Sequence, residues 1–147
     1  TPPARRGMIR PMILSSIRWV RAVLGAVAAE AAQVAAAFGW VVVYSHAIRP
    51  GETLEHYQSY AQTAAPWVAI VAGLPIFYAA SRWIAGNFAS ALVLWGVFVA
   101  IDLALLFSAP SDAPTPWGLI ALSFLSKLLA CVFGGRAAEA RRRTQAG

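Results

Sequence analysis

Long apolar segments alternate with short polar ones along the chain, and four of the apolar segments have the length of a membrane span. They cover approximately residues 22–44, 66–83, 88–107 and 117–133. An α-helix needs about 20 consecutive apolar residues to cross a bilayer. The pattern therefore predicts an all-α integral membrane protein, a four-helix up-and-down bundle that forms one transmembrane domain over residues 1–147.

The longest polar segment between two predicted spans is residues 46–65. Within it, Arg49, Pro50 and Gly51 are typical of a turn, and Thr53 is a candidate N-cap for a following helix. Apolar residues after Thr53 recur on one helical face. We expect a short interfacial helix that leads into the second span.

The remaining polar segments are predicted to be loops or tails. Residues 1–16 and 136–147 are basic, and we expect both to be disordered. The stretch 108–116 is rich in Pro and Ser and is expected to form a tight loop. Glycine is a poor helix former, so the last span is expected to end at Gly134 and Gly135.

Composition agrees with a membrane protein. Hydrophobic residues make up 59% of the chain, charged residues 12%, and the mean hydropathy is +0.62. A soluble domain carries about a quarter charged residues. The net charge of +6 does not indicate nucleic-acid binding, because the arginines cluster beside the spans as they do in membrane anchors. The predicted partner is the lipid bilayer.

The distribution of arginine predicts an orientation. Loops with an excess of Lys and Arg stay in the cytoplasm, and only Arg49 would lie on the outer side. Both termini are therefore expected to be cytoplasmic, in a multi-pass protein of the cytoplasmic (inner) membrane. The Ala- and Arg-rich composition with a single Lys favours a bacterial source. The arginines on the inner side would be Arg5, Arg6, Arg10, Arg18, Arg21, Arg82, Arg136, Arg141, Arg142 and Arg143.

Two opposite charges are expected at matching depth. A charge in hydrocarbon costs roughly 2.5–3.5 kcal/mol, so it is retained for a reason. At 1.5 Å per residue, Glu30 would lie about 12 Å and Lys127 about 10 Å from the cytoplasmic ends of their spans. We predict an intramembrane ion pair or an ion-binding site of Glu30 and Lys127, with Gln33 on the same helical face. Arg82, near the inner end of the second span, is a second candidate partner for Glu30.

A third ionisable residue, Asp102, is expected nearer the outer surface. By depth it would lie level with Tyr44 and close to His46. These residues are candidates for a proton relay. Alternatively, Asp102 contacts a helix of another protein.

A pocket of Trp40, Trp95 and Phe98 is a further hypothesis. Aromatic walls of this kind hold a lipid tail, a quinone or an organic cation. The competing interpretation is ordinary packing inside the bundle.

The sequence offers little for catalysis. It has no GxSxG or HExxH pattern and one cysteine, and its two histidines lie at a membrane edge and in a loop. We expect no metal, no cofactor and no enzyme activity.

A short string in the first span, GAVAAEAAQ over residues 25–33, resembles the first helix of the small multidrug resistance transporters. The resemblance implies a four-helix transporter in which Glu30 is the essential glutamate. The chain departs from that family in its long segment after the first span and in its strong charge asymmetry. We therefore assign no family from this string.

The function expected first is non-enzymatic: an accessory or interaction subunit of a larger membrane complex, or a homo-oligomer, with Glu30 and Lys127 holding two spans together. The alternative is a small proton-coupled transporter or channel that uses Glu30, Lys127 and Asp102. A membrane enzyme acting on a lipid or a quinone is a distant alternative.

Overall fold

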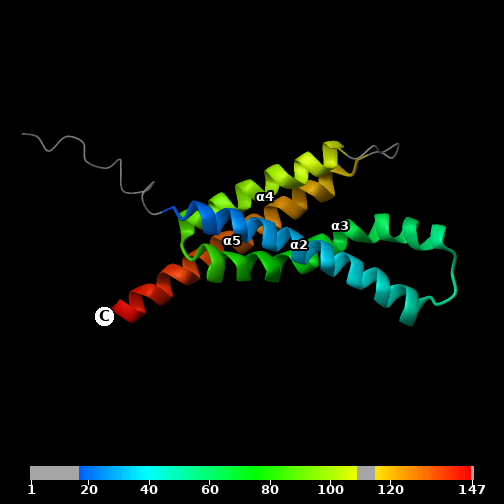
Figure 1. Ribbon diagram of the computed structural model, residues 1–147, viewed down its shortest axis with the longest axis horizontal. Helices are drawn as coiled ribbons and strands as arrows, with labels where there is room; N and C mark the ends of the chain where they lie inside the picture. The colour runs from blue at the N-terminus through cyan, green and yellow to red at the C-terminus, as the bar shows by residue number, and fades with distance from the viewer. Residues whose placement is uncertain (1–16, 109–114, 147) are drawn as a thin grey trace, which may run out of the picture.

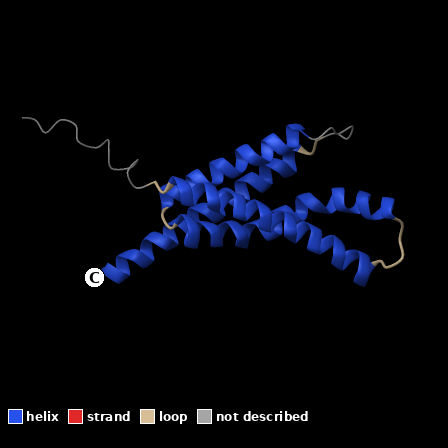
Figure 2. Ribbon diagram, in the orientation of Figure 1, coloured by secondary structure: helices blue, strands red, loops and turns tan. Residues whose placement is uncertain are grey.

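The computed structural model describes residues 17–108 and 115–146, which are almost wholly helical (Figure 1). Figure 2 shows helices joined by short connections. The predicted all-α, four-helix architecture is confirmed for these residues. The expected disorder of residues 1–16 and most of the predicted 108–116 loop lie outside them. The long helices are α2 (Trp19–Val43), α3 (Leu54–Ala79), α4 (Phe88–Ser108) and α5 (Trp117–Ala146), and the π-helical turns η1 (Tyr44–Ile48) and η2 (Ala80–Ala85) extend α2 and α3.

All four helices are long and apolar enough to cross a membrane. Large apolar side chains cover their outer surfaces; Phe38 of α2, Val71 of α3 and Phe107 of α4 are all exposed. Soluble proteins rarely expose large contiguous apolar patches, whereas lipid solvates them. The fold is that of a multi-pass membrane protein. The predicted cytoplasmic position of both termini stays a prediction.

The helices form two antiparallel pairs, α2 with α3 and α4 with α5 (Figure 1). The pairs lie together at the end where α2 begins and α5 finishes, and they diverge toward the other end. The divergence means that two residues at equal distances along their helices need not lie at equal depth.

The connection between α2 and α3 has the predicted turn and cap. Gly51 has a φ of 85°, which favours glycine, and the Thr53 hydroxyl accepts a hydrogen bond from the His56 N–H at 3.3 Å. The helix that Thr53 caps continues without a break to Ala79. The expected short interfacial helix is therefore not a separate element. That the first turns of α3 lie at the membrane interface stays a prediction.

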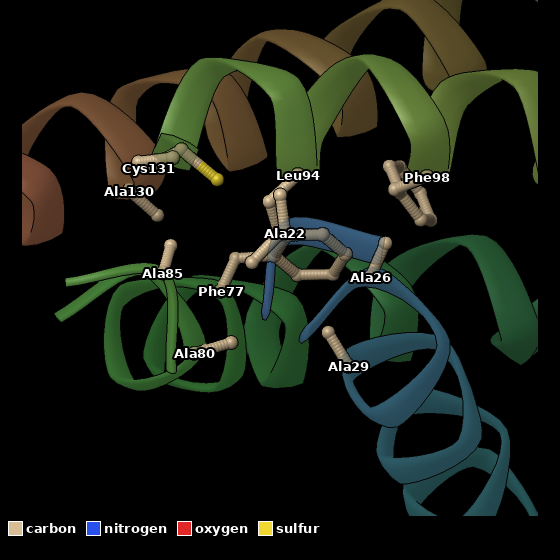
Figure 3. Close-up of a cluster of buried hydrophobic side chains, with 11 residues drawn as sticks. Ala22, Ala26, Ala29, Phe77, Ala80, Ala85, Leu94, Phe98, Ala130 and Cys131 are labelled. Atoms are coloured by element: carbon tan, nitrogen blue, oxygen red, sulfur yellow. The ribbon is translucent and has the colours of Figure 1, made fainter. Parts of the chain in front are cut away.

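Small residues make up much of the core. Figure 3 shows Ala22 and Ala26 of α2 close to Phe77 of α3 and Leu94 of α4. A methyl group at Gly25 would lie 2.6 Å from Leu94 Cδ1, so the two backbones approach closely. Small residues allow such an approach where lipid provides no hydrophobic drive between helices.

The last helix is longer than expected. The helix does not end at Gly134 and Gly135, and residues 136–146, which were expected to be disordered, are helical, because α5 continues to Ala146. Both glycines are buried against other helices. A methyl group would lie 2.6 Å from the Tyr78 carbonyl oxygen at Gly134 and 2.9 Å from Phe88 Cα at Gly135. Tight packing on both sides supports a helix that glycine alone would weaken.

The extended part of α5 also caps the start of α4. The Phe88 N–H donates to Glu139 Oε1 at 2.9 Å, and the Ser90 N–H donates to Asn87 Oδ1 at 2.7 Å. The Ser90 hydroxyl in turn accepts a hydrogen bond from the Arg18 N–H at 2.8 Å. The first N–H groups of a helix lack partners within it, so these side chains fix α4 against α2 and α5.

We expect Glu139→Ala to destabilise the protein by about 2 kcal/mol, because a hydrogen bond to a charged acceptor is lost. Glu139→Gln keeps an acceptor and should cost less. Unfolding in mixed detergent micelles, followed by helicity, measures both variants. Equal stability of Glu139→Ala and the wild type would show that α4 does not depend on this contact.

Candidate functional site

Lys127 lies in the centre of the bundle. Its side chain is 1% exposed and stands on the buried face of α5. Its neighbours at helical spacing on the same face of α5 are also buried. These residues are Ser123, Lys127, Ala130 and Gly134.

Two aromatic rings and one glycine surround the lysine side chain. Its Nζ lies 4.4 Å from the centroid of Phe98 and 5.5 Å from that of Phe77, within range for cation–π attraction. A methyl group at Gly73 would lie 2.9 Å from Lys127 Cε and 3.4 Å from Gln33 Oε1. The absence of a side chain at Gly73 therefore gives the lysine its place beside α3.

Both intramembrane carboxylates lie within electrostatic range of Lys127. The interaction of the ammonium with Asp102 is larger than its interaction with Glu30. Glu30 also lies within electrostatic range of Asp102. All three ionisable groups thus belong to one cluster, which we call the charge cluster.

The expected direct ion pair of Glu30 and Lys127 does not form. In the described part of the chain, the only ion pair within 4.0 Å joins Arg49 to Glu52 at the helix hairpin. Lys127 also lies within electrostatic range of Asp102, which was expected to lie apart from it near the outer surface. The physical reason is the divergence of the helix pairs, which changes the depth of α4 relative to α2.

A cavity of about 420 Å³ reaches the charge cluster. Asp102 and Lys127 line it together with Gln33 and Ser123, so polar groups gather at one part of a largely apolar wall. The remaining lining includes Gln62 and Pro66 of α3, Leu105 of α4 and Pro116 before α5, toward the diverging end. The cavity therefore lies between the two helix pairs and leads to the buried lysine.

Several buried polar atoms near this site lack a hydrogen-bond partner among the described residues. They are Glu30 Oε2 and Gln33 Oε1 on α2, and Ser81 Oγ and Arg82 Nε on η2. Buried polar groups are almost always satisfied. Of these four atoms, Glu30 Oε2 can take up a proton, and Gln33 Oε1 can accept a hydrogen bond from water.

Tyr44 and His46 do not join Asp102. The Tyr44 hydroxyl lies 3.3 Å from His56 Nε2, and its ring stacks on Tyr60 with centroids 3.5 Å apart. His46 Nδ1 lies 3.0 Å from the Val42 carbonyl oxygen. These contacts close the α2–α3 hairpin, and the expected relay of Asp102, Tyr44 and His46 is not assembled.

The three residues of the predicted aromatic pocket do not come together: Trp95 and Phe98 pack against the same core cluster, whereas Trp40 lies apart from them on the α2–α3 hairpin. Trp40 donates from its indole to the Tyr60 hydroxyl at 2.8 Å, and Trp95 donates to the Phe124 carbonyl oxygen at 3.0 Å. Phe98 lies in the core beside Lys127. Trp40 instead lines an apolar groove of about 670 Å³ between α2 and α3.

Arg82 does not act as the second partner of Glu30. Its guanidinium donates to the Tyr78 hydroxyl at 2.8 Å and faces the end of the bundle where α5 finishes. Within the described ranges, no three His, Cys, Asp or Glu side chains gather in a way that would hold a metal ion.

Two residues of the site were missed by sequence reasoning. They are Gly73 and Phe77, neither of which was a predicted site residue. Both lie on α3 at helical spacing, and both contact Lys127. A buried lysine needs apolar or aromatic cover for its methylene groups, which is the signal that could have directed attention to α3.

The sequence matches no protein-family model, and comparisons with curated proteins and with solved structures give no significant match.

Proposed function

We propose that the protein moves protons across the membrane, as a small proton-coupled transporter or channel whose exchange site is the charge cluster. The observation that carries the proposal is a fully buried lysine that makes no ion pair within 4.0 Å in the described chain and borders a cavity. Intramembrane ionisable residues mark ion pathways and proton relays.

The charge cluster has the chemistry of a proton-exchange site. Two carboxylates share the field of one ammonium, so a proton that enters by the cavity competes with Lys127 for Asp102. Gln33 and Ser123 add neutral polar groups beside them. Glu30, with one carboxylate oxygen unsatisfied, would receive the proton on the α2 side.

A flux assay tests this function. The protein is reconstituted in liposomes that contain a pH-sensitive dye, and a potassium diffusion potential drives protons inward. We expect a flux above that of empty liposomes, and we expect Asp102→Asn to reduce it to background, because the amide cannot take up a proton. Glu55→Gln, on the exposed start of α3, is the matched control and should retain the flux.

A wild-type flux equal to that of empty liposomes would contradict proton movement. The carboxyl infrared band then remains as a separate readout of the site. A band that responds to pH in the wild type and disappears in Asp102→Asn would still identify proton binding by this residue.

A second candidate, an interaction subunit or homo-oligomer, is supported by the outer face of α2. Ala28, Ala32, Ala35 and Gly39 are exposed along this helix, and small residues favour close packing of membrane helices. The mass of the protein extracted gently from its membrane, with any co-purifying chains identified, tests this candidate.

A further inference from the structure

Four arginines converge on one small cavity at the end of the bundle where α2 begins and α5 finishes. The cavity measures about 230 Å³. Its arginines come from three elements: Arg21 from α2, Arg82 from η2, and Arg141 and Arg142 from α5. We call this group the arginine pocket.

The arrangement brings like charges together, and no carboxylate lines the cavity among the residues that the structure describes. The Arg142 guanidinium also lies against Gly86, where a methyl group would be 2.9 Å from Nη2, and this position is 4.0 Å from Arg18 Nη1. Glu139 is the one acidic residue of α5, and its carboxylate accepts a hydrogen bond from the Phe88 N–H. The dipole of α5 favours cations in its last turn, but it does not account for Arg21 and Arg82.

The concentration of positive charge also acts on Arg18, which lies beside the arginine pocket at Gly86. The positive charge of Arg142 is the main cause that lowers the pKa of Arg18, ahead of partial desolvation and the charge of Arg21. An anion would relieve this repulsion, since guanidinium groups bind phosphate through paired, charge-assisted hydrogen bonds.

The surroundings indicate a ligand at the membrane surface. Exposed Trp83 lines the same cavity, and Trp is enriched at the level of lipid headgroups. The volume exceeds the roughly 30 Å³ occupied by one water molecule several-fold, which leaves room for an anionic group and its hydration.

We propose that the arginine pocket binds a phosphate group. An anionic phospholipid headgroup and a free phosphate both offer this chemistry. Arg82 would reach the phosphate from η2 and Arg141 and Arg142 from α5, so a bound ligand would hold η2 and the end of α5 together. The proposal is independent of proton movement.

Native mass spectrometry of the purified protein tests the site with defined probes. The probes are phosphatidylglycerol, phosphatidylcholine and inorganic phosphate. We expect phosphatidylglycerol to remain bound and phosphatidylcholine to be lost. Arg141→Gln/Arg142→Gln should weaken the retention by about tenfold, because charged hydrogen bonds are removed.

The matched control is Arg136→Gln/Arg143→Gln, which removes the same charge from the same part of α5. Arg136 lies over the Phe88 ring, 5.7 Å from its centroid, and does not line the pocket. Lipid retention should persist in this variant. Arg141→Lys/Arg142→Lys should give an intermediate result, since charge remains while paired hydrogen bonding is lost.

The results distinguish a lipid site, a free-phosphate site and the absence of a specific site. Binding of inorganic phosphate but not of phosphatidylglycerol, lost in Arg141→Gln/Arg142→Gln only, identifies a soluble source for the same site. If both glutamine variants lose lipid retention equally, the lipid is attracted by net charge alone, and the proposal of a specific phosphate site is overturned. No binding of either anionic probe by the correctly folded wild type, with helicity and a single monodisperse species confirmed, also overturns it.

Discussion

Lys127→Met should abolish proton flux and lower the stability of the protein. Methionine fits between Phe77 and Phe98 in place of the lysine methylene groups, so the core stays filled. The loss of the ammonium leaves Asp102 and Glu30 without the cation that acts on both. Because neither carboxylate forms an ion pair with Lys127 within 4.0 Å in the described chain, the loss of stability should stay below the roughly 3–5 kcal/mol that breaking a buried pair in contact costs.

A double variant separates the two effects. In Lys127→Met/Asp102→Asn the uncompensated carboxylate is gone as well, so stability should return toward that of the wild type while flux stays absent. Arg49→Met is the control, because Arg49 forms an exposed pair with Glu52 far from the cavity. If Lys127→Met left both flux and unfolding unchanged, the charge cluster would contribute neither to proton movement nor to the stability of the bundle.

Gly134→Val should destabilise the bundle by about 3 kcal/mol, the upper end of typical overpacking costs. Even the first carbon of a side chain would lie 2.6 Å from the Tyr78 carbonyl oxygen and 2.9 Å from Ser81 Cβ. The first of these atoms belongs to the backbone and cannot turn aside, so α5 and α3 would have to separate.

Gly96→Val is the matched control for this substitution. Gly96 also lies inside a helix, but nothing stands within 4 Å of a methyl group placed there. Thermal unfolding in detergent compares the two variants. Similar melting temperatures for both would mean that the contact between α3 and α5 yields easily, contrary to the close approach seen at Gly134.

The number of helices could be predicted because apolar length alone indicates it, although α3 begins at Leu54, well before the apolar segment that starts near residue 66. The cap at Thr53 was also predictable, since it depends on residues that are neighbours in sequence. The end of α5 was not. Gly134 and Gly135 weaken an isolated helix, and only their contacts with α3 and α4 show why the helix continues.

The three residues of the charge cluster were singled out from the sequence, but which of them interact was not predicted correctly. Counting residues along straight parallel helices placed Glu30 level with Lys127 and left Asp102 apart. The actual helix pairs diverge, which brings Asp102 into the field of Lys127. The aromatic cover was beyond prediction for another reason: the chain has seven Phe residues, and only packing decides which of them face a given lysine.

The position of Lys127 makes it a natural reporter of bundle opening. It is the chain's single lysine and is almost fully shielded. Amine-specific labelling of this side chain should be slow while the helices stay together, and a lysine-specific protease would have to cut inside a helix at this residue. Labelling or cleavage at this residue therefore registers the separation of the helices and follows its rate without any engineered probe.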